Sequence, residues 1–505
     1  MEEFQTLSCI DRTFADRVLY HTGREKDENL RELLISVMAA AREGHLCIGE
    51  SALSPNGRAG FNTLKASSDV FASFLHIEAG RIYLEKNWSM EQSIVEDLRR
   101  LTGEKKAMAY LSNSHLNIEQ NYAVETALSH RLTLLTGGPG TGKTYTAAAI
   151  VKAWISQGNK GVFLAAPTGR AADHLSKQIE AICGQQYPYG TLHRILGIGS
   201  MPAWPKEQET IDANLLLIDE CSMIDAPMFA TLLKAISNEC TTVLMGDPNQ
   251  LSPVGIGSVF TDLINSTRYS LAKAHLTRSV RTENKEILDL AQTVLRREVA
   301  SHTLISWPTA ERELFSLLKQ FMEPWTCSYA ACPPRVEELF VLLPKFRLLN
   351  SLRQGPHGME AINQWFFNEI QKNTPEGFWW WAPLMITRND EGTGLNNGEL
   401  GVYLEKKGDR SSGAAYFRGR AEPIPEISLP AWEYAFCSSV HKSQGSEYDE
   451  VFVMFPKGSE RFGREMVYTA ITRAKKKVYL LADSKVIETM LSKSFKKQSG
   501  IDFVG

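Results

Sequence analysis

The residues best suited to chemistry form a glycine-rich segment that ends in a lysine and a threonine. The segment follows an apolar run, Leu132–Thr136, and precedes a helical pattern. Glycines let successive backbone N–H groups curl around a phosphate, while the lysine ammonium suits β- and γ-phosphates and the threonine hydroxyl suits Mg²⁺. We therefore predict a nucleotide site in which Lys143 is also catalytic and Thr144 also binds metal, made of Gly137, Gly138, Pro139, Gly140, Thr141, Gly142, Lys143, Thr144 and Tyr145.

Two neighbouring acids, Asp219 and Glu220, supply the second half of this predicted site. They follow four apolar residues, Leu215–Ile218, which are typical of a buried strand. In parallel sheets, ligands bind beyond the carboxyl ends of such strands. We expect Asp219 to bind Mg²⁺ and Glu220 to orient and deprotonate an attacking water. Together with the glycine-rich segment, the pair indicates hydrolysis of the nucleotide and not only its storage.

Two later arginines, Arg281 and Arg473, are candidates for the positive charge that phosphoryl transfer requires. Most arginines are solvated or paired at a protein surface, so residue type alone does not assign this role.

The elements that must position these residues follow from hydrophobic periodicity. From about residue 120, short apolar strands alternate with amphipathic helices, which is typical of a parallel sheet covered by helices. A second set of candidate strands follows Leu276. Between Pro383 and Pro430, short strands separated by turn signals predict a small inserted barrel. Before residue 116, apolar spacings of three and four predict a small helical domain.

The overall composition limits the class of protein. The chain has 505 residues, 43% hydrophobic and 22% charged, and a formal net charge of −3. This near-neutral balance argues against a protein that coats nucleic acid, but it allows a local groove for a polyanion. The eight cysteines are scattered without a C-x-x-C pair, and no apolar run reaches the roughly 18 residues of a membrane span. We therefore expect a cytoplasmic protein with no membrane segment.

The order of the motifs resembles that of superfamily 1 helicases, and in particular of the RecD family, the alpha subunits of exodeoxyribonuclease V. The resemblance runs from about residue 116 to residue 485 and includes, besides the segments above, Gln120, Ala166–Ala172, Thr191–Arg194, Gly246–Leu251, Leu352–Pro356, Pro383–Asp390, Asn397–Gly401 and Val440–Glu447. It implies that Gln120 recognises adenine and that Gln250 senses the γ-phosphate. It also implies that Arg281 and Arg473 are the two catalytic arginines.

The resemblance further implies a set of DNA contacts in which polar and cationic groups bind a single strand without reading its sequence. These are Pro167, Thr168, Arg170, Thr191, His193, His441, Ser443 and Gln444. Taken alone, His441 would more often be a structural histidine, and its place before Ser443 and Gln444 reverses that preference. The run Trp379–Trp381 is a different case, because three adjacent tryptophans at the start of a β-segment favour core and interface packing over base stacking or a partner surface.

The fold implied by the resemblance is α/β, with two RecA-like P-loop domains and a small SH3-like β insertion. The predicted boundaries are 1–115 for a helical N-terminal domain that docks a partner, 116–273 for the first RecA-like domain, 274–382 with 434–505 for the second, and 383–433 for the inserted barrel.

The implied activity is that of an ATP- and Mg²⁺-dependent motor that moves 5′→3′ on single-stranded DNA and acts at duplex ends. It would work with RecB-like and RecC-like subunits in double-strand-break repair, with any nuclease in another subunit. The short region ahead of Gln120 favours this complex-forming type. One alternative is a stand-alone 5′→3′ DNA or RNA helicase. Another is a scaffold whose ATP site regulates assembly, against which Glu220 argues. The segment Gly197–Ile211 has room for only a small strand-separating hairpin, so translocation is expected more firmly than autonomous unwinding.

Overall fold

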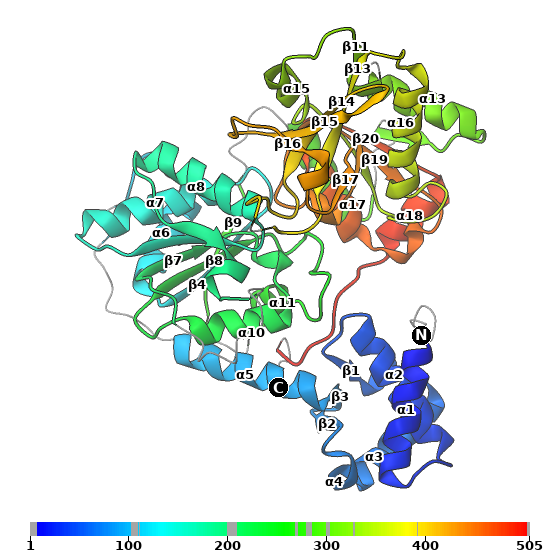
Figure 1. Ribbon diagram of the computed structural model, residues 1–505. Coiled ribbons are helices and arrows are strands. Elements are labelled where there is room, and N and C mark those ends of the chain that lie inside the picture. The colour runs from blue at the N-terminus through cyan, green and yellow to red at the C-terminus, as the bar shows by residue number, and fades with distance from the viewer. Residues whose placement is uncertain are drawn as a thin grey trace.

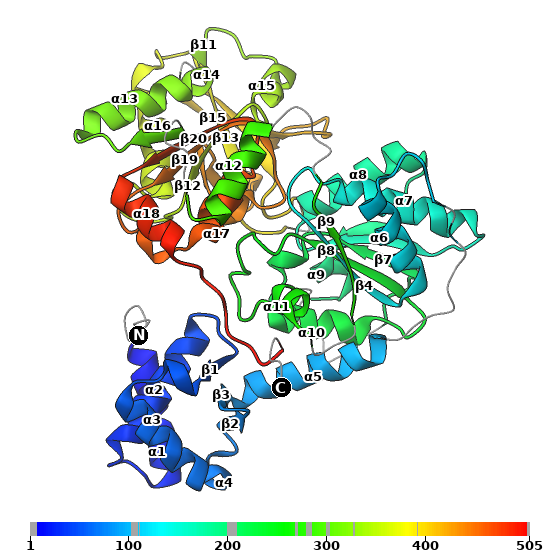
Figure 2. The same cartoon turned by 180° about the vertical axis from the view of Figure 1, so that it is seen from behind.

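The protein consists of three parts that are visible in two opposite views of the computed structural model (Figures 1 and 2). The structure describes residues 8–102, 110, 112–198, 210–267, 271–278, 285–298, 303–326, 329–390 and 392–501. An N-terminal region leads through a long helix into a first α/β domain. A second α/β domain follows and carries an antiparallel sheet. The two α/β domains lie side by side in both views.

The N-terminal region packs helices around a small sheet. Its helices are α1 (Cys9–Thr22), α2 (Glu28–Arg42), α3 (Pro55–Ala66), α4 (Ser68–Phe71) and α5 (Glu85–Leu101). The strands β1 (Cys47–Gly49), β2 (Leu75–Glu78) and β3 (Arg81–Leu84) pair antiparallel in the order β1-β3-β2, a sheet that the helical prediction did not include. Arg100 at the end of α5 donates to the backbone oxygens of Leu233 and Ile236, both at 2.8 Å, and so fixes this region to the first α/β domain.

The first α/β domain contains a six-stranded parallel sheet in the order β6-β5-β7-β8-β4-β9. Its strands are β4 (Leu132–Gly137), β5 (Val162–Ala166), β6 (Tyr189–Thr191), β7 (Leu215–Ile218), β8 (Thr241–Gly246) and β9 (Ala272–Leu276). Its helices are α6 (Ile118–Ser129), α7 (Lys143–Ser156), α8 (Gly169–Cys183), α9 (Leu192–Ile195), α10 (Ala226–Ala235) and α11 (Val259–Asn265). Every residue of β4, β7 and β8 is buried, which explains why these strands are continuous apolar or small-residue runs.

The second α/β domain contains a five-stranded parallel sheet in the order β10-β20-β19-β12-β18. Its strands are β10 (Leu304–Ser306), β12 (Phe346–Asn350), β18 (Cys437–Ser439), β19 (Tyr448–Phe455) and β20 (Ala474–Ala482). Its helices are α12 (Lys285–Leu295), α13 (Glu311–Phe321), α14 (Glu323–Thr326), α15 (Val336–Leu342), α16 (Met359–Asn373), α17 (Arg464–Ile471) and α18 (Ser484–Ser492). Two parallel sheets covered by helices confirm the expected α/β fold.

The second domain carries an antiparallel sheet whose strands lie between β12 and β18 in the chain, except for the short strand β11, which precedes β12. Its strands are β11 (Tyr329–Ala330), β13 (Trp379–Ile386), β14 (Leu400–Lys406), β15 (Asp409–Phe417), β16 (Ile424–Pro425) and β17 (Trp432–Tyr434). The long strand β13 begins ahead of the predicted start of the insertion at residue 383. Trp380 is fully buried, and Trp379 and Trp381 pack against the same core, as expected for core residues.

The C-terminal segment after α18 runs back past the first α/β domain to the N-terminal region, as the red chain in Figure 1 shows. Lys497 donates from Nζ to the backbone oxygens of Pro253 and Gly255. The next residues reach the N-terminal region, where Gln498 N lies 2.9 Å from His45 Nδ1 and Gly500 N donates to the Glu91 carboxylate. One short segment therefore binds all three parts of the protein. Among the described residues, no helix has the length and apolar character needed to cross a membrane.

Candidate functional site

The glycine-rich segment forms a tight loop between β4 and α7. Gly140 and Gly142 adopt φ values of +72° and +84°, a left-handed conformation that side chains with a Cβ rarely take. The loop delivers Lys143 to the first position of α7, and its Nζ donates to the backbone oxygens of Gly137 at 2.6 Å and Gly138 at 3.1 Å. A helix N-terminus and an ammonium group therefore converge on one loop, which is the arrangement that binds phosphate.

The acidic pair lies at the carboxyl end of β7, in the same sheet. Glu220 has φ +55°, a strained conformation for a residue other than glycine, and its backbone N–H donates to Asp219 Oδ1 at 2.9 Å. Withdrawal from water and the Asp219 carboxylate raise the pKa of Glu220 to about 7, although Arg473 and Lys143 oppose the rise. Burial also raises the pKa of Asp219. A carboxyl group with a pKa near 7 is suited to act as a general base.

Three hydrogen bonds join the segment Gly246–Leu251 of the first domain to the second domain. Tyr468 OH donates to Asp247 Oδ2 at 2.9 Å, and the backbone N–H of Leu251 donates to Thr469 Oγ1 at 2.9 Å. Gln444 Nε2 donates to the backbone oxygen of Leu251 at 3.4 Å. These contacts are buried. They hold the two domains together next to the acidic pair, at what we call the nucleotide cleft.

Arg473 reaches the nucleotide cleft from the end of α17. Its side chain donates to the backbone oxygens of Thr469 at 3.0 Å and Ser446 at 3.3 Å. Its charge acts on Glu220, whose pKa it lowers against the effect of burial. The cation of the second domain thus faces the acids of the first. The other predicted arginine, Arg281, lies outside the described residues, and its role stays a prediction.

Two buried glutamines carry polar atoms without partners among the described residues. Gln120 uses Oε1 to accept from the backbone N–H of Asn117 at 3.1 Å, whereas its Nε2 has no partner. Gln250 Oε1 also has none. The neighbouring Glu119 accepts from Thr277 N at 2.8 Å, which anchors Gln120 near the end of β9 beside the glycine-rich loop. Buried polar atoms normally have partners, so these amides have free capacity for a ligand.

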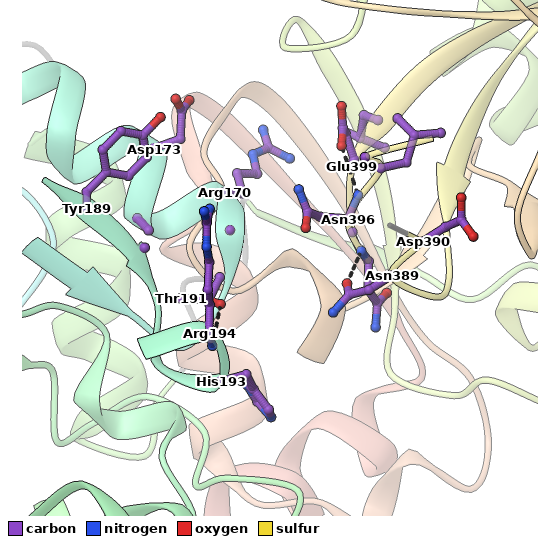
Figure 3. A pocket seen from close by; sticks show the side chains of 18 of the residues that line it. Arg170, Asp173, Tyr189, Thr191, His193, Arg194, Asn389, Asp390, Asn396 and Glu399 are labelled. Atoms are coloured by element: carbon purple, nitrogen blue, oxygen red, sulfur yellow. Dashed lines mark hydrogen bonds between the residues drawn. The ribbon is translucent and has the colours of Figure 1, made fainter. Parts of the chain in front are cut away.

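A second space, which we call the open cleft, lies between the first domain and the antiparallel sheet (Figure 3). Its volume is about 1400 Å³. Residues of the first domain and loop residues of the antiparallel sheet line opposite sides: Arg170, Lys177, Thr191, His193 and Arg194 from the former, and Asn389, Asp390, Asn396, Asn397 and Glu399 from the latter. Asp390 and Glu399 are acidic, but the cationic and amide groups on both sides of the cleft suit a nucleic-acid backbone.

The predicted DNA contacts are distributed between the two clefts. Arg170, Thr191 and His193 line the open cleft together. Thr168, which follows Pro167, caps α8 by accepting from the backbone N–H of Ala171 at 3.3 Å. On the second domain, Ser443 is buried against the backbone oxygen of Val440, and Gln444 points to the nucleotide cleft. His441 is half-buried. Its burial, and to a smaller extent the charge of Lys497, lower the pKa of the imidazole, which favours a neutral ring.

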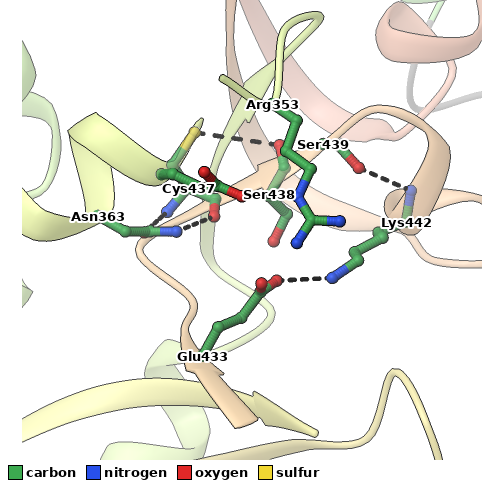
Figure 4. Close-up of polar contacts among 8 residues, drawn as sticks. Arg353, Asn363, Glu433, Cys437, Ser438, Ser439 and Lys442 are labelled. Atoms are coloured by element: carbon green, nitrogen blue, oxygen red, sulfur yellow. Dashed lines mark hydrogen bonds and ion pairs between the residues drawn. The ribbon is translucent and has the colours of Figure 1, made fainter. Parts of the chain in front are cut away.

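Polar contacts anchor the turn that follows β18 (Figure 4). Lys442 Nζ forms an ion pair with Glu433 Oε1 of β17 at 2.7 Å. Asn363 of α16 exchanges two hydrogen bonds with the backbone of Cys437, at 2.8 and 2.9 Å. These contacts therefore link the antiparallel sheet to the segment His441–Gln444.

Sequence reasoning did not single out several residues that join the domains. Tyr468 and Thr469 lie one helical turn before Arg473 in the same segment, and Asp247 lies next to Gly246 in a segment that was noted for Gln250. Their proximity to predicted site residues was the only available signal, because the hydrogen-bonding partners lie more than two hundred positions away in the sequence. Tyr448, at the start of β19, also joins the domains, because Arg170 Nη1 lies 3.5 Å from its hydroxyl, and no pattern in the sequence pointed to it.

Comparison with protein families places the two α/β domains among nucleotide-driven motors. Residues 115–307 match the family model described as AAA domain, and residues 434–481 match that of the UvrD-like helicase C-terminal domain. The RecBCD enzyme subunit RecD of Mycolicibacterium smegmatis is 30% identical over 462 residues, which cover 83% of this chain and 81% of the relative.

Two further similarities complete the comparison. The ATP-dependent RecD2 DNA helicase of Deinococcus radiodurans is 28% identical over 79% of this chain and 55% of its own length. Among solved structures, Bacteroides Pif1 bound to single-stranded DNA is 18% identical with a TM-score of 0.43, over 74% of this chain and 93% of that one.

Proposed function

The chain belongs to the RecD family of ATP-dependent DNA helicases, and from this premise we propose that it is the 5′→3′ single-stranded-DNA translocase and helicase subunit of a RecBCD-type exodeoxyribonuclease V. One observation carries the proposal. The nucleotide cleft lies between the two α/β domains, and the open cleft lies between the first domain and the antiparallel sheet that the second domain carries, so a change at one cleft would move the walls of the other. A motor that converts hydrolysis into steps along a strand needs that arrangement.

The residues of the nucleotide cleft fit ATP with Mg²⁺. The loop at Gly137–Thr144 and the unpartnered amide atoms of Gln120 and Gln250 provide positions for phosphates and base. Thr144 and Asp219 would hold the metal, since Mg²⁺ is bound through one or two protein oxygens in addition to phosphates. Bound Mg²⁺ would neutralise charge that develops on the transferring phosphoryl group.

Three side chains of the protein would then have separate roles in hydrolysis. Lys143 would exchange its two backbone acceptors for phosphate oxygens. Glu220, ionised above a pKa of about 7, would orient a water molecule and accept its proton. Arg473 would add positive charge from the second domain only when the cleft is closed, which makes closure a condition for catalysis.

Changes in the nucleotide cleft would reach the open cleft through the domain interface. Asp247, Leu251 and Gln250 lie in one short segment that contacts both the acidic side of the cleft and the second domain. Opening after hydrolysis would move Arg170, Thr191 and His193 relative to the loops of the antiparallel sheet. Repeated cycles would advance the strand, with contacts to phosphates and not to base edges.

The partners in this proposal are RecB-like and RecC-like subunits, single-stranded DNA and duplex ends, and the location is the cytoplasm. The relative from M. smegmatis is itself named as a RecBCD subunit, which supports the assembly. The N-terminal region is a candidate for docking the partners, because it projects from the two α/β domains in Figures 1 and 2. The boundaries predicted for the four domains stay part of the proposal, as does the SH3-like character of the antiparallel sheet.

The proposal is tested by ATPase and translocation assays on the full chain, alone and with its co-purified partners. We expect ATP hydrolysis that single-stranded DNA stimulates, and movement toward the 3′ end of the strand. Lys143→Gln should abolish both activities while the circular dichroism spectrum and melting temperature stay unchanged. Retained ATP-driven movement in this variant would contradict the assignment of the site. Unwinding of a 5′-tailed duplex by the chain without partners would instead favour a stand-alone helicase.

A further inference from the structure

Tyr448, at the start of β19, contacts Arg170 of the open cleft and Arg473 of the nucleotide cleft. Its side chain is 3% exposed. Arg170 of the first domain reaches it from the open cleft, with Nη1 3.5 Å from Tyr448 OH and the guanidinium carbon 5.6 Å from the ring centroid. On the other side of the residue, the backbone N–H of Tyr448 donates to the backbone oxygen of Arg473 at 2.8 Å. One tyrosine therefore contacts a DNA-cleft arginine through its side chain and the catalytic arginine through its backbone.

A second arginine makes this contact sensitive to charge. Arg347 of β12 is fully buried, and its guanidinium carbon lies 4.9 Å from the Tyr448 ring centroid. Arg347 Nη1 donates to the backbone oxygen of Ala435, whereas Nε and Nη2 have no hydrogen-bonding partner among the described residues. A buried cation without a carboxylate is costly, and here the Tyr448 ring and oxygen are a main source of compensation.

Two guanidinium groups therefore share one phenol. Burial would raise the pKa of Tyr448, but Arg347 and Arg170 outweigh it and lower that pKa to about 8. The two cations also repel each other, and the presence of Arg170 disfavours the charged form of Arg347. A phosphate bound to Arg170 would neutralise one cation and draw it away from the phenol. The arrangement is thus less favourable without a polyanion in the open cleft than with one.

The segment around Tyr448 transmits such a shift because it is tightly packed. Gly445 has φ +70°, and a Cβ at this position would lie 3.3 Å from Ala171 Cβ at the start of α8. One residue further on, the backbone oxygen of Ser446 accepts from Arg473 Nη1 at 3.3 Å. Residues 445–448 thus touch the DNA-facing end of α8 on one side and the catalytic arginine on the other.

We propose that Tyr448 is a positioning residue through which a DNA phosphate on Arg170 sets the placement of Arg473, so that strand occupancy controls the rate of ATP hydrolysis. This inference rests on the proposed function, because it assumes that the open cleft binds single-stranded DNA. It assigns the stimulation of ATPase by DNA to one side chain, with Arg347 as the buried charge that makes that side chain responsive.

The test compares Tyr448→Phe with wild type in the full chain. The substitution keeps the ring against Arg347 and removes the hydroxyl that Arg170 approaches. We expect the stimulation of ATPase by oligo(dT) to fall severalfold and by less than about tenfold, because a contact of 3.5 Å is weaker than an ordinary hydrogen bond to a charged group. The rate without DNA and the dissociation constant for oligo(dT) should both stay close to wild type. Tyr479→Phe, on the neighbouring strand β20, is the matched control and should leave the stimulation unchanged.

The possible results separate the inference from the proposed function. If wild type shows no stimulation by oligo(dT), the proposed function fails. If wild type is stimulated and Tyr448→Phe is stimulated equally, the inference alone is overturned. The inference is also overturned if Tyr448→Phe loses its ATPase stimulation only to the extent that it loses affinity for oligo(dT), since Tyr448 would then only support binding. Arg347→Met, checked for folding by its melting temperature, provides a second measurement and should also lower the stimulation while the rate without DNA persists.

Discussion

The nucleotide cleft and the open cleft lie between the same two domains, yet their side chains are held in different ways. In the nucleotide cleft, buried hydrogen bonds cross from one domain to the other, as between Tyr468 and Asp247. In the open cleft, the cross-domain contact of Arg170 with Tyr448 is long, at 3.5 Å, and most polar groups face a space of about 1400 Å³. One cleft is preorganised before any ligand arrives, and the other is shaped to receive a chain.

This difference matches the role that we propose for each cleft. Catalysis of phosphoryl transfer depends on groups placed in advance, because a misplacement of about 1 Å costs roughly 100-fold in rate. Binding a strand without sequence preference depends instead on distributed charge and tolerates substitution. Single substitutions should therefore have large effects in the nucleotide cleft and small ones in the open cleft.

After Lys143→Gln, the largest effect is expected for Glu220→Gln, which keeps the shape of the side chain and removes the proposed base. Steady-state ATP hydrolysis should fall by about 10²–10⁴-fold, the usual contribution of a general base. Affinity for a fluorescent ATP analogue should persist, because the phosphate loop is untouched. Glu180→Gln on the exposed side of α8 is the control and should hydrolyse ATP like wild type.

The pH dependence of the wild type provides a second check on Glu220. Its pKa is raised to about 7, so the base is ionised above that pH and protonated below it. The value of kcat/KM for ATP should therefore decline as the pH falls through about 7. Hydrolysis that stays constant from pH 8 to pH 6, or full activity in Glu220→Gln, would exclude Glu220 as the base.

A smaller effect is expected for Tyr468→Phe, which removes a cross-domain hydrogen bond to a carboxylate. Such bonds contribute about 1.5–3 kcal/mol, so we expect roughly a tenfold decrease in kcat for ATP. Burial and Asp247 hold the pKa of Tyr468 above its usual range, so the hydroxyl is a donor at all working pH values. Cleft closure, followed by fluorescence transfer between labels on the two domains, should weaken in parallel. An unaltered kcat would show that the two domains do not need this bond to close.

The same contrast explains what the sequence could predict. The glycine-rich loop, Asp219 and Glu220 are local patterns in which the chemistry dictates the spacing. The two strands that precede them could therefore be predicted from the residues nearby, while the roles of the side chains stay predictions. The parallel sheets followed from alternating apolar runs. The antiparallel sheet was predicted from turn residues, but it extends further toward the N-terminus than predicted. Strand β13 begins at Trp379, because Trp379–Trp381 pair with Leu404–Lys406, and the short strand β11 (Tyr329–Ala330) pairs with β13 from before β12.

Contacts between distant segments could not be predicted in this way. The N-terminal sheet is built from very short strands, such as Cys47–Gly49, that carry little periodic signal. Tyr448 and Arg347 are brought together by the parallel pairing of β12 with β19, and Arg170 joins them only when the domains meet. Hydrophobic patterns predict where the strands lie in the sequence. Which side chains meet across a domain interface depends on the complete fold.

In the open cleft, Arg170→Ala tests the contribution of one cation. The affinity for single-stranded oligonucleotides should weaken to a similar degree whatever their sequence. The slope of log affinity against log salt concentration should decrease by about 0.7, as expected for one lost phosphate contact with a single strand. Fluorescence anisotropy over a range of KCl concentrations measures both. A sequence-dependent loss would indicate base readout, and an unchanged slope would place the strand elsewhere.

The smallest effect is expected for Lys177→Ala, a substitution in the same cleft. Lys177 lines the cleft but forms an ion pair with Asp173 at 2.7 Å, one helical turn away, with side chains 71% and 43% exposed. Exposed pairs of this kind contribute less than about 0.5 kcal/mol to the free energy of unfolding. Because Asp173 already balances its charge, Lys177 should add less than Arg170 to the salt dependence of oligo(dT) binding. A loss of affinity as large as that of Arg170→Ala would mean that the strand displaces Asp173, and that the open cleft is also organised by specific contacts.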